Sequence, residues 1–147
     1  MSIVNSVSKY LCVLFALGAL TACAGTGTRD KAAIHQQIAN ATPNTVFVSR
    51  STGFGGSAVR IAIEVDGVVV AQLSNNQVAS FELPIGEHFI RAKFRGAAGV
   101  TVSSATLRYV EDLTKPQFLN VAKKSKLVGA ELILSEVSPR SFVGTVW

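Results

Sequence analysis

The fold is decided by residues 60–73, which read RIAIEVDGVVVAQL. Apolar and polar residues alternate in the first half of this stretch, which is the pattern of a half-buried strand. Ile61 and Ile63 are expected to face the core, whereas Arg60 and Glu64 face solvent. Asp-Gly at 66–67 is the strongest short-range signal of a β-hairpin. The stretch therefore predicts two antiparallel strands.

Two registers are open for this hairpin. A two-residue turn pairs Val65 with Val68 and places Gln72 on the inner face. A three-residue loop pairs Glu64 with Val68 and turns Leu73 inward. We prefer the second because it buries Leu73 and exposes Gln72, and because a one-residue slip moves every side chain to the opposite face.

The segment around the hairpin, residues 45–138, continues the strand pattern. It is rich in Val, Ile and Thr, and short apolar runs are separated by turn residues. The pattern predicts an all-β sandwich or barrel, including one strand over residues 100–110 and one over 117–122. Residues 123–126 are expected to form a basic connection, and residues 139–147 an apolar C-terminal tail.

The composition fits one small domain preceded by a targeting segment. The chain has 147 residues, of which 48% are hydrophobic and 16% are charged, which argues against a disordered chain. The apolar run at 11–20 is about 15 Å long as a helix, too short to span a bilayer core of about 30 Å. Residues 1–22 are therefore predicted to be a signal peptide.

The apolar run ends in Leu20-Thr21-Ala22-Cys23, which resembles a bacterial lipobox. The resemblance implies that the Cys23 thiol carries diacylglycerol. It also implies cleavage before Cys23 and a fatty acyl chain, such as palmitate, on the new amine. The alternative is an ordinary secretory signal that is cut near Ala22 or Ala24 and leaves a free thiol.

Lipidation agrees with the cysteine count. The chain has two cysteines, and Cys12 would leave with the signal peptide. Lipidation would use the other one, so no disulfide is expected. Ala24 follows Cys23, and by resemblance to lipoprotein sorting this favours the outer membrane, facing the periplasm, over the inner membrane. Residues 23–44 are expected to form a linker, in which residues 30–40 are compatible with a short helix.

The strand-rich segment resembles a family of small bacterial lipoprotein domains of unknown function, related to PEGA and carboxypeptidase-regulatory-like domains. The matching residues are 46–50, 56–58, 65–67, 71–73, 81–90, 118–121 and 130–134. The resemblance implies a transthyretin-like β-sandwich of about seven strands and supplies no catalytic residues.

Chemistry-bearing residues are few in this chain. It has two histidines and no spare cysteine, and no acidic pair has a spacing typical of general acid–base catalysis. We therefore expect no enzyme, no metal site and no cofactor apart from the lipid on Cys23. His88 is expected to lie under a turn with one backbone hydrogen bond, and a ligand or pH-sensing role is the alternative.

Basic residues form the second notable feature. Arg91, Lys93 and Arg95 are expected on the outward face of one strand, and Lys123, Lys124 and Lys126 in the basic connection. They are candidate contacts for anionic phospholipid, lipopolysaccharide or peptidoglycan. The alternative is a solvated strand face. Nucleic acid is not expected because the export signal separates the domain from it.

These features favour a lipid-anchored periplasmic protein that acts as a non-enzymatic interaction or structural module of the cell envelope. Exposed sheet edges or basic loops would contact an envelope protein or the wall. The alternative function is a binder or sensor of a small hydrophobic or anionic ligand. That ligand would bind between the sheets or at the glycine-rich loop around Gly53, Gly55 and Gly56.

Overall fold

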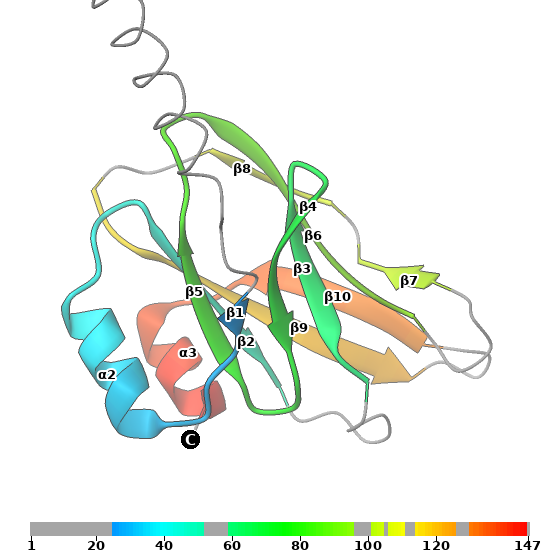
Figure 1. Ribbon diagram of the computed structural model, residues 1–147, viewed down its shortest axis with the longest axis horizontal. Helices are drawn as coiled ribbons and strands as arrows, with labels where there is room; N and C mark the ends of the chain where they lie inside the picture. The colour runs from blue at the N-terminus through cyan, green and yellow to red at the C-terminus, as the bar shows by residue number, and fades with distance from the viewer. Residues whose placement is uncertain are drawn as a thin grey trace, which may run out of the picture.

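The computed structural model describes residues 25–51, 59–95, 101–104, 106–110, 114–125 and 130–146. These residues form two β-sheets and two short helices (Figure 1). The predicted all-β class is therefore confirmed. Cys23, Lys126, the glycines at 53, 55 and 56 and the acidic residues at 111 and 112 lie outside the described residues.

The larger sheet, sheet A, has six strands in the order β1-β4-β3-β6-β7, with β8 also paired to β6. Their bounds are β1 (Gly25–Thr26), β3 (Ile61–Val65), β4 (Val68–Leu73), β6 (Glu87–Arg95), β7 (Thr101–Ser103) and β8 (Leu107–Val110). Sheet B has the order β10-β9-β2-β5. Its strands are β2 (Thr45–Arg50), β5 (Val78–Glu82), β9 (Gln117–Ser125) and β10 (Ala130–Glu136).

The main core lies between the two sheets. Sheet A contributes residues such as Ile61, Ile63 and Ile90, and sheet B contributes residues such as Val48 and Leu119, all of them at most 1% exposed. Burial of side chains of this size stabilises a fold by about 1.5–3 kcal/mol each. The expected inward orientation of Ile61 and Ile63 is confirmed.

The register at the hairpin turn differs from the one we preferred, although Leu73 is buried as that register predicted. Val65 pairs with Val68, so the turn has two residues. Asp66 (φ 51°) and Gly67 (φ 84°) both have positive φ, as the favoured hairpin turn requires. A β-bulge in β4 opposite the Ile63–Glu64 step then adds one residue and restores the alternation. Leu73 is therefore fully buried, as expected, through a different geometry.

A second core covers the outer face of sheet B. It joins Ile34 of α2 (Lys31–Ala39) and Phe142 of α3 (Pro139–Val146) to Phe47, Val78 and Phe118. The rings of Phe47 and Phe118 are stacked at 5.3 Å, and the Phe142 ring is 5.0 Å from Phe118. Both helices lie on one side of the molecule in Figure 1. Because sheet B is covered on both faces, all six residues of β2 are buried.

The segments that flank the predicted domain are part of the fold. Residues 139–147 were expected as an apolar tail, but α3 forms there and buries Phe142 completely. Within the expected linker, Asp30 caps α2 by accepting hydrogen bonds from Ala32 and Ala33. Strand β1 pairs in parallel with β4. The described part of the expected linker is therefore packed against the domain.

Two predicted strand boundaries are also corrected. The strand expected over 100–110 is divided into β7 and β8, and the register on β6 shifts by one residue between Lys93↔Ser103 and Ile90↔Leu107. Between them, the buried Ser104 bonds to both backbone groups of Ala92. Strand β9 continues to Ser125, beyond its expected end at residue 122, because β10 pairs with it over seven residues.

Candidate functional site

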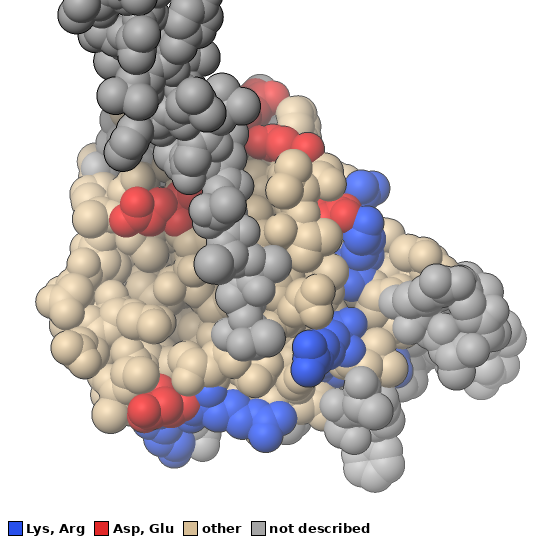
Figure 2. All heavy atoms as spheres, viewed as in Figure 1, with Lys and Arg blue, Asp and Glu red and all other residues tan. Residues whose placement is uncertain are grey.

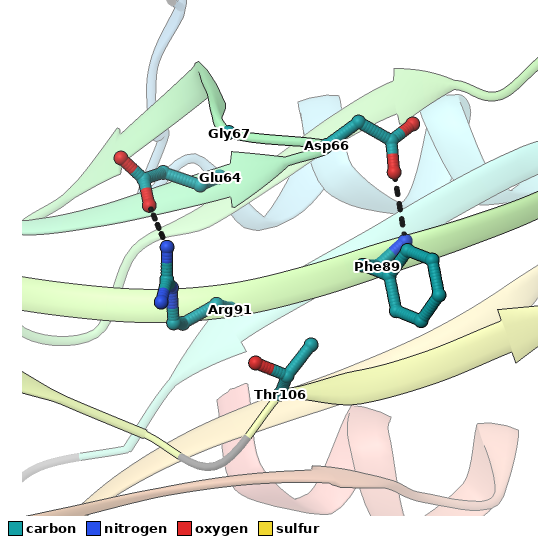
Figure 3. Close-up of a pocket in the computed structure, with 6 residues that line it drawn as sticks. All are labelled: Glu64, Asp66, Gly67, Phe89, Arg91 and Thr106. Carbon is teal, nitrogen blue, oxygen red and sulfur yellow. Dashed lines mark hydrogen bonds and ion pairs between the residues drawn. The ribbon is translucent and has the colours of Figure 1, made fainter.

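The candidate site is an open pocket of about 370 Å³ on the outer face of sheet A. Strand β3, the hairpin turn, β6 and the start of the β8 segment surround it (Figure 3). Its lining residues are Glu64, Asp66, Gly67, Phe89, Arg91 and Thr106. Thr106 forms one wall of the pocket and lies between β7 and β8, where the register on β6 shifts by one residue.

A buried carboxylate forms one side of the pocket. The Glu64 side chain is only 5% exposed, and its two oxygens contact Arg91 Nη2 (3.3 Å) and Lys93 Nζ. The hydrogen bond from Lys93 lowers the pKa of Glu64, and the charges of both cations add to this effect, while burial acts in the opposite direction. Glu64 is therefore ionised and paired at neutral pH.

The position of Glu64 corrects its expected exposure. Alternation in β3 placed it on the outer face, and the structure does so, but Arg91 and Lys93 cover it from the neighbouring strand β6. Sequence reasoning therefore missed it as a site residue. The sequence did contain a signal: one acidic residue would face two basic residues across an expected pair of strands.

A hydrogen-bonded group around Asp66 forms the other side of the pocket. Asp66 Oδ2 is 2.7 Å from His88 Nδ1, and Oδ1 accepts a hydrogen bond from the Phe89 backbone N–H at 2.9 Å. His88 Nε2 lies 2.8 Å from the carbonyl oxygen of Pro84. The hydrogen bond with His88, followed by that with Phe89, lowers the pKa of Asp66. The expected place of His88, under a turn with one backbone hydrogen bond, is confirmed.

The four predicted basic residues whose side chains the structure describes lie on two different sheets. Arg91 and Lys93 lie on sheet A and are held by Glu64. Lys123 and Lys124 lie on β9 of sheet B, where successive side chains point to opposite faces. Figure 2 shows the Lys and Arg side chains of this face in separate groups.

The two β9 lysines have different surroundings. Lys123 is half-buried, with its Nζ 5.5 Å from the centre of the Phe94 ring. Lys124 is exposed and lies opposite Glu131 in the strand register. The side chain of Arg95 and all of Lys126 lie outside what the structure describes.

At the end of the sandwich beside Arg50, little space remains between the two sheets. Residues Arg50, Val59, Ile61, Phe94 and Lys123 surround a space there that does not admit a water-sized probe. The Arg50 side chain closes this end by donating hydrogen bonds to the carbonyl oxygens of Val59 and Leu73. The pocket outside sheet A is therefore the better candidate for a ligand than this part of the core.

No group of three or more His, Cys, Asp or Glu residues within the described ranges has an arrangement that could hold a metal ion. No helix among those residues is long and apolar enough to cross a membrane.

The pocket combines a buried, paired carboxylate, an aspartate that is hydrogen-bonded to His88 outside the lining, and an exposed aromatic ring. Most of its polar groups are hydrogen-bonded or ion-paired within the protein. Such an arrangement is typical of a fixed surface and not of a set of free reactive groups. Comparisons of the chain with protein-family models, with curated proteins and with solved structures found no match.

Proposed function

We propose that this chain is a lipid-anchored protein of the bacterial envelope that acts as a non-enzymatic interaction module. Its anchor is a diacylglycerol and an acyl chain on Cys23, and its place is the outer membrane, facing the periplasm. The Leu20-Thr21-Ala22-Cys23 motif supports the anchor. Two or more acyl chains give stable membrane attachment, whereas one gives only marginal attachment.

We also propose that the two-sheet architecture is of the transthyretin-like type, related to PEGA and carboxypeptidase-regulatory-like domains. The sequence pattern of residues 46–90 and the two facing sheets support this assignment. Domains of this shape offer partners a surface of strands and loops, and function then depends on the sites they carry.

The observation that carries the interaction role is the free edge of β10. Within the described ranges, all seven residues of β10 pair with β9, and no strand pairs with the other side. The exposed Ile133 lies in the same strand. An edge of this length can accept a strand from a partner protein by main-chain hydrogen bonding.

Strand geometry identifies the backbone groups that point toward a partner. The Val137 N–H donates to Phe118 just beyond the end of β10. Because the direction of backbone groups alternates in an antiparallel ladder, the N–H groups of Leu134 and Glu136 point away from β9. Glu136 is exposed, so it can be replaced without disturbing the core.

The test compares Glu136→Pro with Glu136→Ala in crosslinking and pull-down of the lipidated protein from its native envelope. Both variants lose the carboxylate, and only the proline variant loses the outward N–H and adds a ring at the edge. We expect a several-fold loss of captured partner for Glu136→Pro alone. Equal capture by both variants would exclude strand addition at β10, and equal capture by Cys23→Ser would exclude a role for the anchor.

A second candidate function is binding of a small hydrophobic or anionic ligand in the sheet A pocket. The observation that favours it is that the exposed Phe89 and the cationic Arg91 both line a pocket of about 370 Å³. The dye anilinonaphthalene sulfonate combines an apolar ring system with an anion and is a suitable probe. We expect Phe89→Ser and Arg91→Gln to reduce dye binding, and unchanged binding in both would exclude the pocket.

A further inference from the structure

Three large apolar side chains are exposed at one end of the molecule. This end, here called the tip, consists of the Asp66-Gly67 turn, the turn at 84–86 and the first residues of β4 and β6. The exposed fractions are 63% for Val68, 78% for Ile85 and 47% for Phe89. Ile85 occupies a turn, where polar residues are the ordinary choice. Large apolar side chains exposed close together at one end of a molecule suggest contact with a membrane or a protein.

The tip holds these side chains in fixed positions. His88 bonds to Asp66 of one turn and to Pro84 of the other. Phe89 exchanges hydrogen bonds with Asp66: its N–H donates to the carboxylate, and its carbonyl accepts from the Asp66 N–H. The two turns are therefore linked by hydrogen bonds, and Val68, Ile85 and Phe89 lie in or beside them. Figure 1 shows both turns at the same end of the sheets.

The first described strand, β1, runs away from the tip. Strand β1 is parallel to β4, with Gly25 opposite Ala71 and Thr26 opposite Gln72. The strand direction at β1 therefore points back toward the start of β4, which is the tip. Backbone bonds from Gly27 to Gln72 and between Thr28 and Val78 fix the segment after β1.

Very little chain separates this fixed segment from the proposed anchor. Only Ala24 lies between Cys23 and Gly25. Two residues of extended chain span at most about 7 Å. A lipid on Cys23 must therefore enter the bilayer close to the domain, on the side toward which β1 points back.

We propose that the tip rests in the bilayer surface, with Val68, Ile85 and Phe89 inserted at the boundary between the lipid headgroups and acyl chains. This inference rests on the proposed lipidation of Cys23. The lipid holds the domain at the membrane, and the three side chains set its orientation by burying apolar surface. The sheet A pocket then lies beside the membrane surface, whereas the far ends of the sheets face the periplasm.

Single-cysteine labelling of the lipidated full-length protein tests this orientation. Cys12 would be removed with the signal peptide and Cys23 would be blocked by lipid, so one introduced cysteine carries the only reactive thiol. The test positions are Ile85→Cys and Phe89→Cys. The matched control is Arg60→Cys, which is exposed and precedes β3 at the end opposite the tip. Each variant carries an environment-sensitive nitrobenzoxadiazole dye and is reconstituted in vesicles of phosphatidylethanolamine and phosphatidylglycerol.

We expect a blue-shifted emission at residues 85 and 89 and several-fold stronger quenching by brominated lipids than at residue 60. Equal accessibility at all three positions in lipidated protein would overturn the tip proposal. Dyes that are shielded from water but not quenched by brominated lipid would also overturn it, because a protein, such as a second copy, would then cover the tip. Mass spectrometry of the same samples detects the lipid on Cys23, so a failure of the proposed anchor is recognised separately.

Discussion

Asp66 and His88 form the shortest side-chain link at the tip, with 2.7 Å between Asp66 Oδ2 and His88 Nδ1. Asp66 lies in the β3–β4 turn, and His88 lies at the start of β6. The same carboxylate also receives the Phe89 N–H. One aspartate that shapes a hairpin turn therefore also positions the neighbouring strand.

The first prediction concerns the acid stability that Asp66 provides. Its pKa is lower in the folded protein than the ordinary value of 3.8, so folding favours the ionised form. This contribution is complete above the unfolded pKa and is lost as the pH falls through the folded pKa. Asp66→Asn keeps a residue that tolerates positive φ but cannot ionise. We expect urea unfolding to show a smaller stability loss for Asp66→Asn than for wild type between about pH 5 and about pH 2.

The second prediction concerns His88. Its two ring nitrogens face the Asp66 carboxylate and the Pro84 carbonyl, and both of these are acceptors. His88→Ala removes both contacts, so we expect urea denaturation at one fixed pH to show a loss of about 1–3 kcal/mol in the free energy of unfolding. His88→Gln, whose side-chain amide can still donate to one of the two acceptors, is expected to lose less. Equal stability of the three proteins would contradict a role of His88 in linking the two turns.

The third prediction compares the two ways of breaking the Glu64 ion pairs. Arg91→Met with Lys93→Met leaves a buried carboxylate unpaired, which costs about 3–5 kcal/mol in comparable cases. Glu64→Gln leaves two cations whose side chains are 44% and 36% exposed, and it should cost about 1–3 kcal/mol.

The control for this comparison is the triple variant. Adding Glu64→Gln to the Arg91→Met, Lys93→Met background should recover part of the lost free energy of unfolding, because the unpaired charge is removed. Additive losses would show that the carboxylate is not energetically coupled to the two cations.

The fourth prediction concerns the C-terminal helix. Phe142 is fully buried against Phe47 and Phe118. Phe142→Ala should lower the free energy of unfolding by about 3–5 kcal/mol. Arg140→Ala on the exposed side of the same helix is the control, with an expected change within about 0.5 kcal/mol. Similar small effects of both variants would mean that α3 contributes little to the fold.

The fifth prediction concerns Gly27, which follows β1. A Cβ at this position would lie 2.6 Å from Leu73 Cδ2 and 2.8 Å from Gln77 Cβ. Gly27→Ala should therefore displace the segment from sheet A. We expect faster hydrogen exchange at the Gly27 and Thr28 amides, which donate to Gln72 and Val78. Unchanged exchange at both amides would show that the sheet accommodates the methyl group.

The sequence predicted those features that depend on local periodicity. The alternation in β3, the hairpin at Asp66, the helix after Asp30 and the turn over His88 all follow from residues close together in the chain. The two-residue turn was misjudged because a bulge in β4 compensates for it, and bulges leave little trace in an apolar run such as 68–70.

The features that the sequence could not predict depend on contacts between distant segments. The burial of Glu64 requires β6 to place two cations over it, and these lie 27 and 29 positions further along the chain. Phe142 is one apolar residue in a short final segment, and its partners are residues 47 and 118. Periodicity within a window of a dozen residues does not report such pairings.

The complete enclosure of β2 has a consequence for the order in which the molecule opens. A strand with neighbours on both edges and packed side chains on both faces cannot expose its amides by local fraying. Its amide protons should exchange only when the whole domain opens, and their rate then reports the global free energy of unfolding. Among the described strands, the two-residue β1 pairs with β4 alone, and its release requires far less free energy. The chain therefore contains a slow-exchanging centre and a separately detachable N-terminal segment.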